Sequence, residues 1–466
     1  MGDELFTFNG VDALTGQFLL PAMSVASVSE LARGRRGAPP ERKTGPKRGV
    51  RDGVDPRSLA SSGWAVLMSH DAEPALLEAL QPLLAHRAAE AARVDGRRFR
   101  VLVGADGVRP GESKQALLER LGAAPTGAVS PDRLPYYVLI VGGPEAVSFE
   151  LQALLDVQYA VGRIHFDTID EYARYAASVV EAETAPRPRA PRVSLFGTRH
   201  PGDPATTLSA TRLLAGIEAS LVLGRRGWTL DACVGEPATK ARLAALLSGE
   251  DAPALLFTAT HGVGFPCGDP LQRARQGALL CQDWPGPASP RGPLREEFYL
   301  SADDIADDAD VRGLIACFFA CYGGGTPAFD ATAHHGGSGQ PRRIAPAPFV
   351  AGLPRRLLAH PRGGALAVIA HVDRAWSCSF NTRRSAEVDT YTSVLDRLVA
   401  GHPIGSALEW FGSRHAELAA ELAAELDTSS LTGASVRLAT LWTATNDARN
   451  FVLLGDPAVR LSGVTA

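Results

Sequence analysis

Two residues of the sequence have the chemistry of a nucleophile and a base, and each follows an apolar run that ends in glycine. The run ALLFTATHG, residues 254–262, ends with His261 before Gly262, and GLIACFFACYGG, residues 313–324, places Cys321 two residues before Gly323. A thiolate is an effective nucleophile, and a neighbouring imidazolium lowers the pKa of a cysteine and can protonate a leaving amine. The pair predicts attack by sulfur on a carbonyl carbon.

The glycine after the histidine has a predicted function of its own. Without a Cβ, Gly262 lets a substrate carbonyl approach the backbone, and the N–H groups of Gly262 and Cys321 could together stabilise a developing oxyanion. Cys317 lies four positions earlier within the same apolar run as Cys321. Because burial raises the pKa of a thiol, we expect Cys317 to be inert.

The elements that must position these residues are strands of one sheet. Apolar runs at 136–143, 192–197, 228–235, 254–262, 313–324 and 363–372 alternate with helical patterns. This alternation predicts an α/β fold with a mostly parallel sheet that helices cover on both faces. Parallel strands align their carboxyl ends, about 5 Å apart, so side chains that follow two neighbouring strands can meet.

The Pro- and Arg-rich stretch TAPRPRAPR, residues 184–192, is the predicted internal boundary. It separates a smaller, non-catalytic α/β subdomain at 61–185 from a catalytic domain at 190–466. Residues 1–60 form a predicted N-terminal segment that contains a basic, flexible linker at 33–51.

Composition excludes several functional classes. The chain has 466 residues, 21% of them charged, and a formal net charge of −4, which is typical of an ordinary globular protein. The basic linker is more consistent with a solvated segment than with a nucleic-acid contact. No apolar run reaches the roughly 20 residues that cross a bilayer, and no secretory signal is recognisable. We therefore expect a cytoplasmic protein without nucleic-acid, membrane, metal or cofactor binding.

The blocks LLFTATHG and IACFFACYGG resemble the catalytic motifs of the caspase-like clan of cysteine peptidases. The segment 135–164 and the closing FVLLGDPAVRL, 451–461, are more similar to the gingipain-like family, so the resemblance covers about 135–461. It implies a caspase-like three-layer α/β/α fold, Cys321 as nucleophile and His261 as general acid and base. It also implies a protein or peptide substrate, a thioester acyl-enzyme and an activating partner. The sequence offers no convincing third catalytic residue.

The resemblance also suggests where specificity arises. The strand after the nucleophile, residues 367–380, would line the pocket for the residue before the scissile bond. There Asp373 could bind Lys or Arg, Arg374 an acidic side chain, and Trp376 could form an apolar wall. Asp283, in the loop after the histidine strand, is a second acidic candidate, and the balance favours basic specificity. Self-cleavage is predicted after Arg343 or within the basic linker.

Three alternatives compete with a cysteine peptidase. The same fold could serve as a catalytically silent binding or scaffold protein. The residues His261, Cys267, Cys281 and Cys321 could bind a metal, although their spacing matches no compact zinc pattern. A serine hydrolase is disfavoured because no GxSxG elbow follows a strand.

Overall fold

A ten-stranded sheet runs through the whole protein. The computed structural model describes residues 5–34, 49–185, 189–221, 227–249, 252–330, 341–377, 379–380, 388–428 and 435–461. The strands follow the order β5-β4-β6-β7-β18-β17-β14-β10-β8-β9 across the sheet. Their bounds are β4 Trp64–Leu67, β5 Phe99–Leu102, β6 Tyr137–Val141, β7 Ala160–Ile164, β8 Ala190–Gly197, β9 Thr229–Val234, β10 Pro253–Ala259, β14 Ile315–Phe319, β17 Ala367–His371 and β18 Phe451–Gly455.

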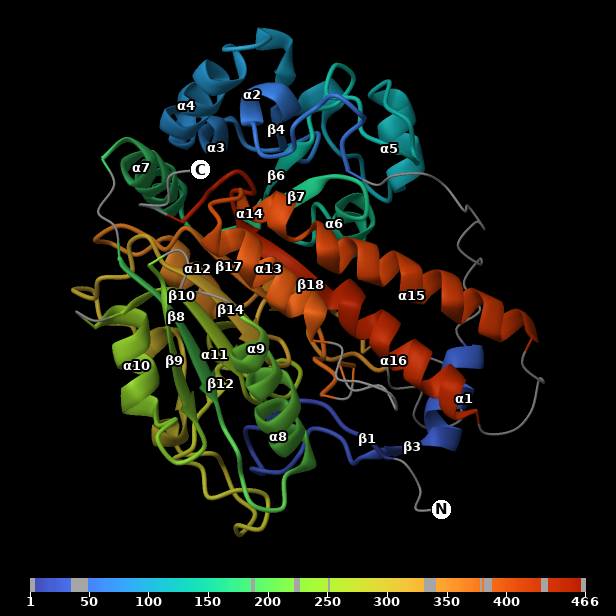
Figure 1. The fold of residues 1–466 in the computed structure, drawn as a ribbon, viewed down its shortest axis with the longest axis vertical. Helices are drawn as coiled ribbons and strands as arrows, with labels where there is room; N and C mark the ends of the chain where they lie inside the picture. The colour runs from blue at the N-terminus through green and yellow to red at the C-terminus, as the bar shows by residue number, and fades with distance from the viewer. Residues whose placement is uncertain are drawn as a thin grey trace.

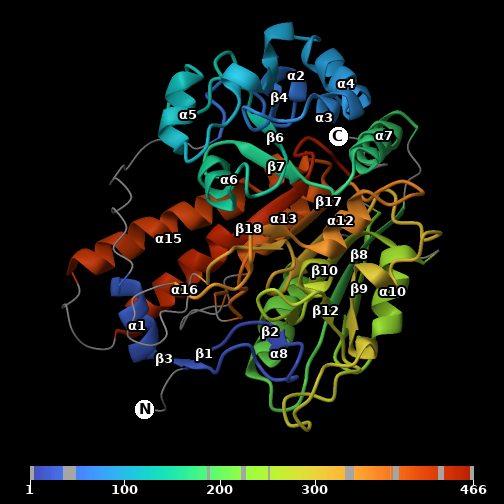
Figure 2. The same cartoon turned by 180° about the vertical axis from the view of Figure 1, so that it is seen from behind.

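Eight of the sheet's neighbouring pairs are parallel, and the pair β17–β18 is antiparallel. Helices α9 (Ala215–Ser220) and α13 (Asp389–Val399) contact each other on the face shown in Figure 1. Helix α12 (Gly352–Leu358) lies on the other face, seen in Figure 2. The prediction of a mixed α/β fold with a mostly parallel sheet between helices is confirmed.

The two sides of the predicted boundary share this sheet. The boundary falls between helix α7 (Ile169–Thr184) and β8, while β7 from the first side pairs with β18 from the chain's end. Buried side chains from β4 to β18 form one continuous apolar cluster. Such strands are apolar throughout because both faces of a parallel sheet are covered.

Other helices cover the sheet or extend from it. The longest, α15 (Glu409–Thr428), packs along α16 (Val436–Asn450), which in turn contacts α1 (Val25–Gly34), as Figure 1 shows. The remaining helices of six or more residues have the bounds α3 Pro74–Ala79, α4 Gln81–Ala91, α5 Lys114–Arg120, α6 Phe149–Asp156 and α10 Lys240–Ser248. In the described part of the chain, no helix is long and apolar enough to cross a membrane.

A second, smaller sheet covers one end of the large one. Its order is β13-β12-β11-β2, with β12 at Leu279–Leu280 and β13 at Tyr299–Leu300, and the edge strand β2 (Gly10–Asp12) comes from the N-terminal segment. Strand β2 pairs in parallel with β11 (Gly262–Gly264), directly after the predicted catalytic histidine. Val11 and Val263 are buried together in a separate small apolar cluster. The N-terminal segment is therefore a built-in part of the fold at this end of the molecule.

Candidate active site

His261 and Cys321 follow adjacent parallel strands at matching positions. Strand β10 pairs with β14 with Ala259 opposite Phe319, so each of the two residues lies two positions beyond the same rung of the ladder. The Thr260 N–H extends this ladder by donating to the Phe319 carbonyl at 3.2 Å. The sheet therefore brings the imidazole and the thiol to neighbouring strand ends, as the sequence predicted.

A carboxylate that sequence reasoning missed orients the histidine. Asp203 Oδ2 lies 2.6 Å from His261 Nε2, and both side chains are fully buried. Asp203 Oδ1 also accepts from the N–H groups of Ala205 and Thr206, which caps helix α8 (Pro204–Leu208). Because an ionised carboxylate only accepts, Nε2 carries a proton and Nδ1 is the atom free to exchange one. Among the described residues, Nδ1 has no hydrogen-bond partner.

The sequence did contain a signal for Asp203. The stretch TRHPGDP follows β8, and an Asp before a Pro is typical of the cap and first residue of a helix. Strand β8 neighbours β10, so its carboxyl end lies beside that of the histidine strand. Strand order is not readable from the sequence, and so the proximity of this helix start to His261 could not be predicted.

The backbone after Cys321 adopts an unusual conformation. Tyr322 has φ 60° and Asp373 has φ 70°, values in the left-handed region that non-glycine residues rarely adopt. The two are joined, because the Tyr322 N–H donates to the Asp373 carbonyl at 2.7 Å. The Ala375 N–H donates to Cys321 Sγ at 3.3 Å. This turn fixes the thiol against the strand end after β17.

Gly262 is a glycine because it touches the backbone of Cys321. A Cβ at this position would lie 1.8 Å from the Cys321 carbonyl oxygen. The N–H groups of Gly262 and Cys321 both point at one acceptor, the Asn9 carbonyl oxygen, at 2.9 and 3.0 Å. Two convergent N–H donors beside a thiol have the geometry of an oxyanion site.

Burial sets the protonation of the thiol, whereas His261 sets that of the Asp203 carboxylate. Burial raises the pKa of Cys321 to about 12, although the Arg374 guanidinium and the Ala375 N–H favour the thiolate. Burial alone would also raise the pKa of Asp203, but the charge and hydrogen bond of His261 outweigh it and lower that pKa to about 2. With both side chains buried, the Cys321 thiol is therefore neutral and the Asp203 carboxylate is ionised. Cys317, in the middle of β14, likewise has a pKa raised by burial.

The predicted specificity residues lie in different surroundings. Trp376 is buried, and its indole packs edge-on against the Phe8 ring with centroids 5.5 Å apart. Its backbone N–H donates to Asp447 Oδ1 at 2.7 Å. Arg374, the residue proposed to attract an acidic side chain, forms a buried ion pair with Asp330 at 2.5 Å. Its charge is therefore already compensated within the fold.

The two acidic candidates differ as well. Asp373 is nearly buried and lines a hollow together with Phe149, Arg449 and Asn450. Asp283 accepts the Lys240 N–H at 2.7 Å and so helps to start α10. Nothing in the described contacts of Asp283 links its carboxylate to Cys321. Its neighbour Trp284, which the sequence analysis did not single out, instead packs edge-on against His261 with centroids 6.1 Å apart.

Two other predicted features lie away from this arrangement. Arg343 donates to the Pro346 carbonyl at 2.8 Å and stacks over the Phe329 ring, while much of its predicted cleavage loop and most of the basic linker fall outside the described residues. Within the described chain, the one group of three side chains close enough to share a metal ion is His86, Glu90 and Glu183. It contains none of the four residues considered as metal ligands.

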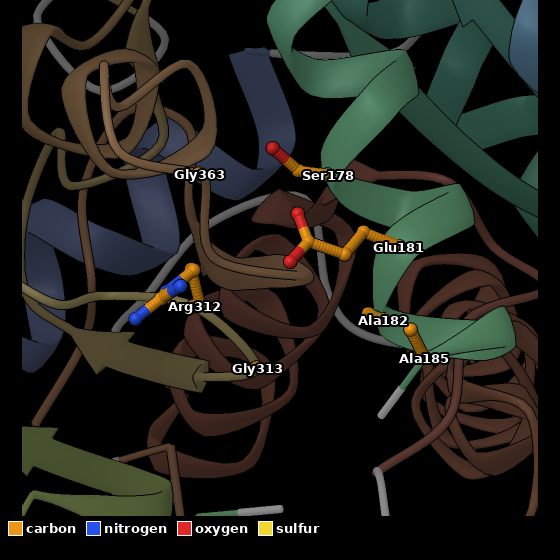
Figure 3. Close-up of a pocket in the computed structure, with 7 residues that line it drawn as sticks. All are labelled: Ser178, Glu181, Ala182, Ala185, Arg312, Gly313 and Gly363. Atoms are coloured by element: carbon orange, nitrogen blue, oxygen red, sulfur yellow. The ribbon is translucent and has the colours of Figure 1, made fainter. Parts of the chain in front are cut away.

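A further hollow lies at the other ends of the central strands. Figure 3 shows Glu181 of α7 pointing towards Arg312 and the loops at Gly313 and Gly363, with Ser178 beside it. Gly313 and Gly363 precede β14 and β17, so this hollow lies near the amino ends of those strands. Its lining contains neither a thiol nor an imidazole, whereas Cys321 and His261 follow the carboxyl ends of β14 and β10.

The chain is similar to known proteins in structure but not in sequence. No family model matches the chain, and no curated protein matches it significantly. A solved structure described as a protease aligns with a TM-score of 0.48 and 12% identity, over 86% of this chain and 79% of that one. The Arg-specific cysteine proteinase gingipain R aligns with a TM-score of 0.45 and 11% identity, over 89% and 80%. The complex of the pro- and mature domains of RgpB from Porphyromonas gingivalis aligns with a TM-score of 0.47 and 11% identity, over 86% of this chain and 79% of that one. Likeness at this level assigns no residue.

Proposed function

We propose that the protein is a cysteine endopeptidase with Cys321 as nucleophile and His261 as general acid and base. The observation that carries the proposal is the convergence of the Gly262 and Cys321 N–H groups on a single carbonyl oxygen, 2.9 and 3.0 Å away, beside the thiol. A site built in this way binds the oxygen of a carbonyl under attack more strongly as negative charge develops on it.

The reaction follows from the positions of the protons. His261 Nδ1 takes the proton of the Cys321 thiol, and sulfur attacks the substrate carbonyl carbon. The C–N bond then breaks, Nδ1 returns the proton to the leaving amine, and a thioester remains. Water, deprotonated by the same Nδ1, attacks the thioester carbon, the C–S bond breaks and the carboxylic acid leaves. Nδ1 then returns the proton to Cys321 Sγ. Asp203 acts as a positioning residue that holds Nε2 and stabilises the imidazolium.

The preference for Lys or Arg before the scissile bond stays a prediction. It requires an acidic side chain at the end of the pocket, and Asp373 is the candidate that lines a hollow. Trp376 is the candidate for the apolar wall, and its indole packs on the Phe8 ring. The activating partner and the cytoplasmic location are also predictions.

The test is a positional peptide-library cleavage assay with the wild-type protein, Cys321→Ala and the matched thiol control Cys317→Ala. We expect the wild type and Cys317→Ala to cleave the same peptides and Cys321→Ala to cleave none. Cleavage that survives in Cys321→Ala would contradict the assignment. Absence of any cleavage or thiol labelling would favour the catalytically silent scaffold. Two observations suggest this alternative: the thiol is buried, and the Gly262 and Cys321 N–H groups already donate to the Asn9 carbonyl.

A further inference from the structure

The N-terminal segment of the chain occupies the candidate active site. The acceptor of the Gly262 and Cys321 N–H groups is the backbone carbonyl of Asn9, and Asn9 is completely buried. A carbonyl of the chain itself therefore lies where the proposed mechanism requires the carbonyl of a substrate.

The residues before Asn9 bind as an extended peptide would. The Asn9 N–H donates to the Ala375 carbonyl at 3.0 Å, and Phe8 forms an antiparallel bridge with Trp376. One residue further, Ser377 Oγ donates to the Thr7 carbonyl at 3.0 Å. Strand addition of this kind is a general way to hold a peptide in a cleft, with main-chain bonds for affinity and side-chain pockets for selectivity.

The residue after Asn9 lies against the nucleophile. A Cβ on Gly10 would lie 3.2 Å from Cys321 Sγ and 2.6 Å from Leu19 Cδ1, so the segment fits at this point because residue 10 is glycine. Gly10 then continues into β2, which pairs with β11 after the catalytic histidine, and its carbonyl accepts from the Leu19 N–H at 3.1 Å. The Asn9–Gly10 peptide bond is thus held on both sides next to the thiol.

The Asn9 side chain has its own binding site. Nδ2 donates to Ser209 Oγ at 3.3 Å and to the Thr260 carbonyl at 3.1 Å. Ser209 opens a π-helical turn, Ser209–Leu214, that continues the helix capped by Asp203. A carbonyl acceptor requires a donor, so an amide fits where a carboxylate would face the Thr260 oxygen. No carboxylate is a hydrogen-bond partner of Asn9 within the described contacts.

The contacts of Phe8 also favour one type of side chain before the asparagine. The Phe8 ring lies between the Trp376 indole and the Arg374 guanidinium, which is 4.8 Å from the ring centroid. Both contacts favour an aromatic residue directly before the asparagine. These contacts hold the segment in place although the Phe8 side chain carries no charge.

We infer that Asn9–Gly10 is presented to Cys321 as an intramolecular substrate, that cleavage there opens the site, and that the site then takes peptides with an aromatic residue followed by Asn before the scissile bond. The inference rests on the proposed cysteine peptidase function. Cys321 Sγ bonds to the Asn9 carbonyl carbon, the Asn9–Gly10 C–N bond breaks, and His261 Nδ1 gives its proton to the Gly10 nitrogen. Water then hydrolyses the thioester, which releases residues 1–9 with a carboxylate at Asn9.

Cleavage changes what covers the thiol. Before it, the N-terminal segment holds both N–H donors and excludes other peptides. After it, residues 5–9 are held only by contacts that a free peptide of the same sequence would make, because the covalent connection to β2 is lost. The segment is thus both the first substrate and the cover of the site.

The test follows the new N-terminus at Gly10 by intact mass and N-terminal sequencing of the full chain during prolonged incubation. The variants are Cys321→Ala, Asn9→Asp, Asn9→Arg and the exposed control Leu14→Ala. We expect the wild type and Leu14→Ala to lose residues 1–9 at equal rates and Cys321→Ala to stay intact. Asn9→Asp and Asn9→Arg should be cut at least about tenfold more slowly, since Asp lacks the donor that Asn9 Nδ2 gives to the Thr260 carbonyl and Arg brings a buried cation to a site where no carboxylate is a described partner of residue 9. Equal or faster cleavage of Asn9→Arg would overturn the asparagine preference in favour of basic specificity. The same mass spectra report any cut after Arg343.

A second arm separates failure of the inference from failure of the proposed function. Phe8→Ala loosens the N-terminal segment, so this full chain should react at Cys321 with a Thr-Phe-Asn acyloxymethyl ketone faster than the wild type does. The Phe8→Ala chain should also react faster with this compound than with the Thr-Phe-Arg compound. It should also cut a synthetic LFTFNGVD peptide between Asn and Gly. An adduct at Cys321 without any Asn–Gly cut, in the chain or in the peptide, overturns the inference and leaves the peptidase. No adduct at Cys321 in any chain removes both.

Discussion

The role of Asp203 can be tested by replacing its charge while keeping its shape. Asp203→Asn retains an oxygen that can accept from Ala205 and Thr206, and Asn is as good a helix cap as Asp. What it loses is the negative charge 2.6 Å from His261 Nε2, in a site where both side chains are buried. A hydrogen bond to a charged group contributes about 1.5–3 kcal/mol, so the rate at which the Cys321 sulfur attacks an electrophile should fall about 10- to 150-fold.

The assay is the second-order rate of adduct formation at Cys321 with a peptidyl acyloxymethyl ketone, measured from pH 5 to 9. This rate constant does not depend on the fraction of folded protein, provided that active sites are counted. Asp95→Asn is the matched control, since Asp95 also caps a helical turn, Gly96–Arg98, by accepting from the Arg97 N–H. This turn precedes the predicted boundary at 184–192, whereas Asp203 follows it. A rate for Asp203→Asn within about threefold of the wild type, with an unchanged pH profile, would refute the role given to Asp203.

Four further predictions follow from the same contacts. Gly262→Ala should abolish activity, because its Cβ would lie 1.8 Å from the Cys321 carbonyl oxygen, and full activity in this variant would contradict the close approach. Alkylation of Cys321 by iodoacetamide in freshly purified, uncleaved chain should rise with pH up to pH 10 without levelling, because burial raises its pKa to about 12, and a plateau near pH 7 would contradict the covered state. Asp203 has a folded pKa of about 2, below its ordinary value of 3.8, so it stabilises the fold above about pH 4 and this contribution is lost as the pH falls towards 2. Denaturant unfolding should therefore show Asp203→Asn about 2 kcal/mol less stable than wild type at pH 6, with the difference shrinking below pH 4; a difference that does not depend on pH would argue against it. Trp376→Ala should lower the affinity for peptides with an aromatic residue before Asn by about tenfold or more and spare those with a small residue there, and equal losses for both would remove its role as an apolar wall.

The sheet and the adjacency of the strands that end at His261 and Cys321 were predictable because their signals are local. Each buried parallel strand is a continuous apolar run, and the runs at 254–262 and 313–324 coincide with β10 and β14. His261 and Cys321 each come at the end of one of these runs, which predicted that they lie at neighbouring strand ends, and the structure places each two positions beyond the same rung of the ladder. The glycine after the histidine was likewise legible as a site of close approach.

The parts that were missed depend on contacts between distant segments. Asp203 reaches His261 because β8 lies next to β10, and Ser209 reaches Asn9 because a helix continues from that cap. Asn9 itself lies in a stretch, LFTFNGVD, with no catalytic signature. Its carbonyl accepts from the Gly262 N–H because β2 pairs with β11, with Gly10 opposite Gly262, across some 250 residues, and no local pattern encodes such a pairing.

The most direct test of the central claim is to locate the covalent adduct of a peptidyl acyloxymethyl ketone by tandem mass spectrometry of the full chain with Phe8→Ala. The structure predicts a single adduct on Cys321, absent in Cys321→Ala and unchanged in Cys317→Ala. An adduct on Cys317 or on the exposed Cys267, or the same labelling after Cys321→Ala, would contradict the account of Cys321 as the nucleophile.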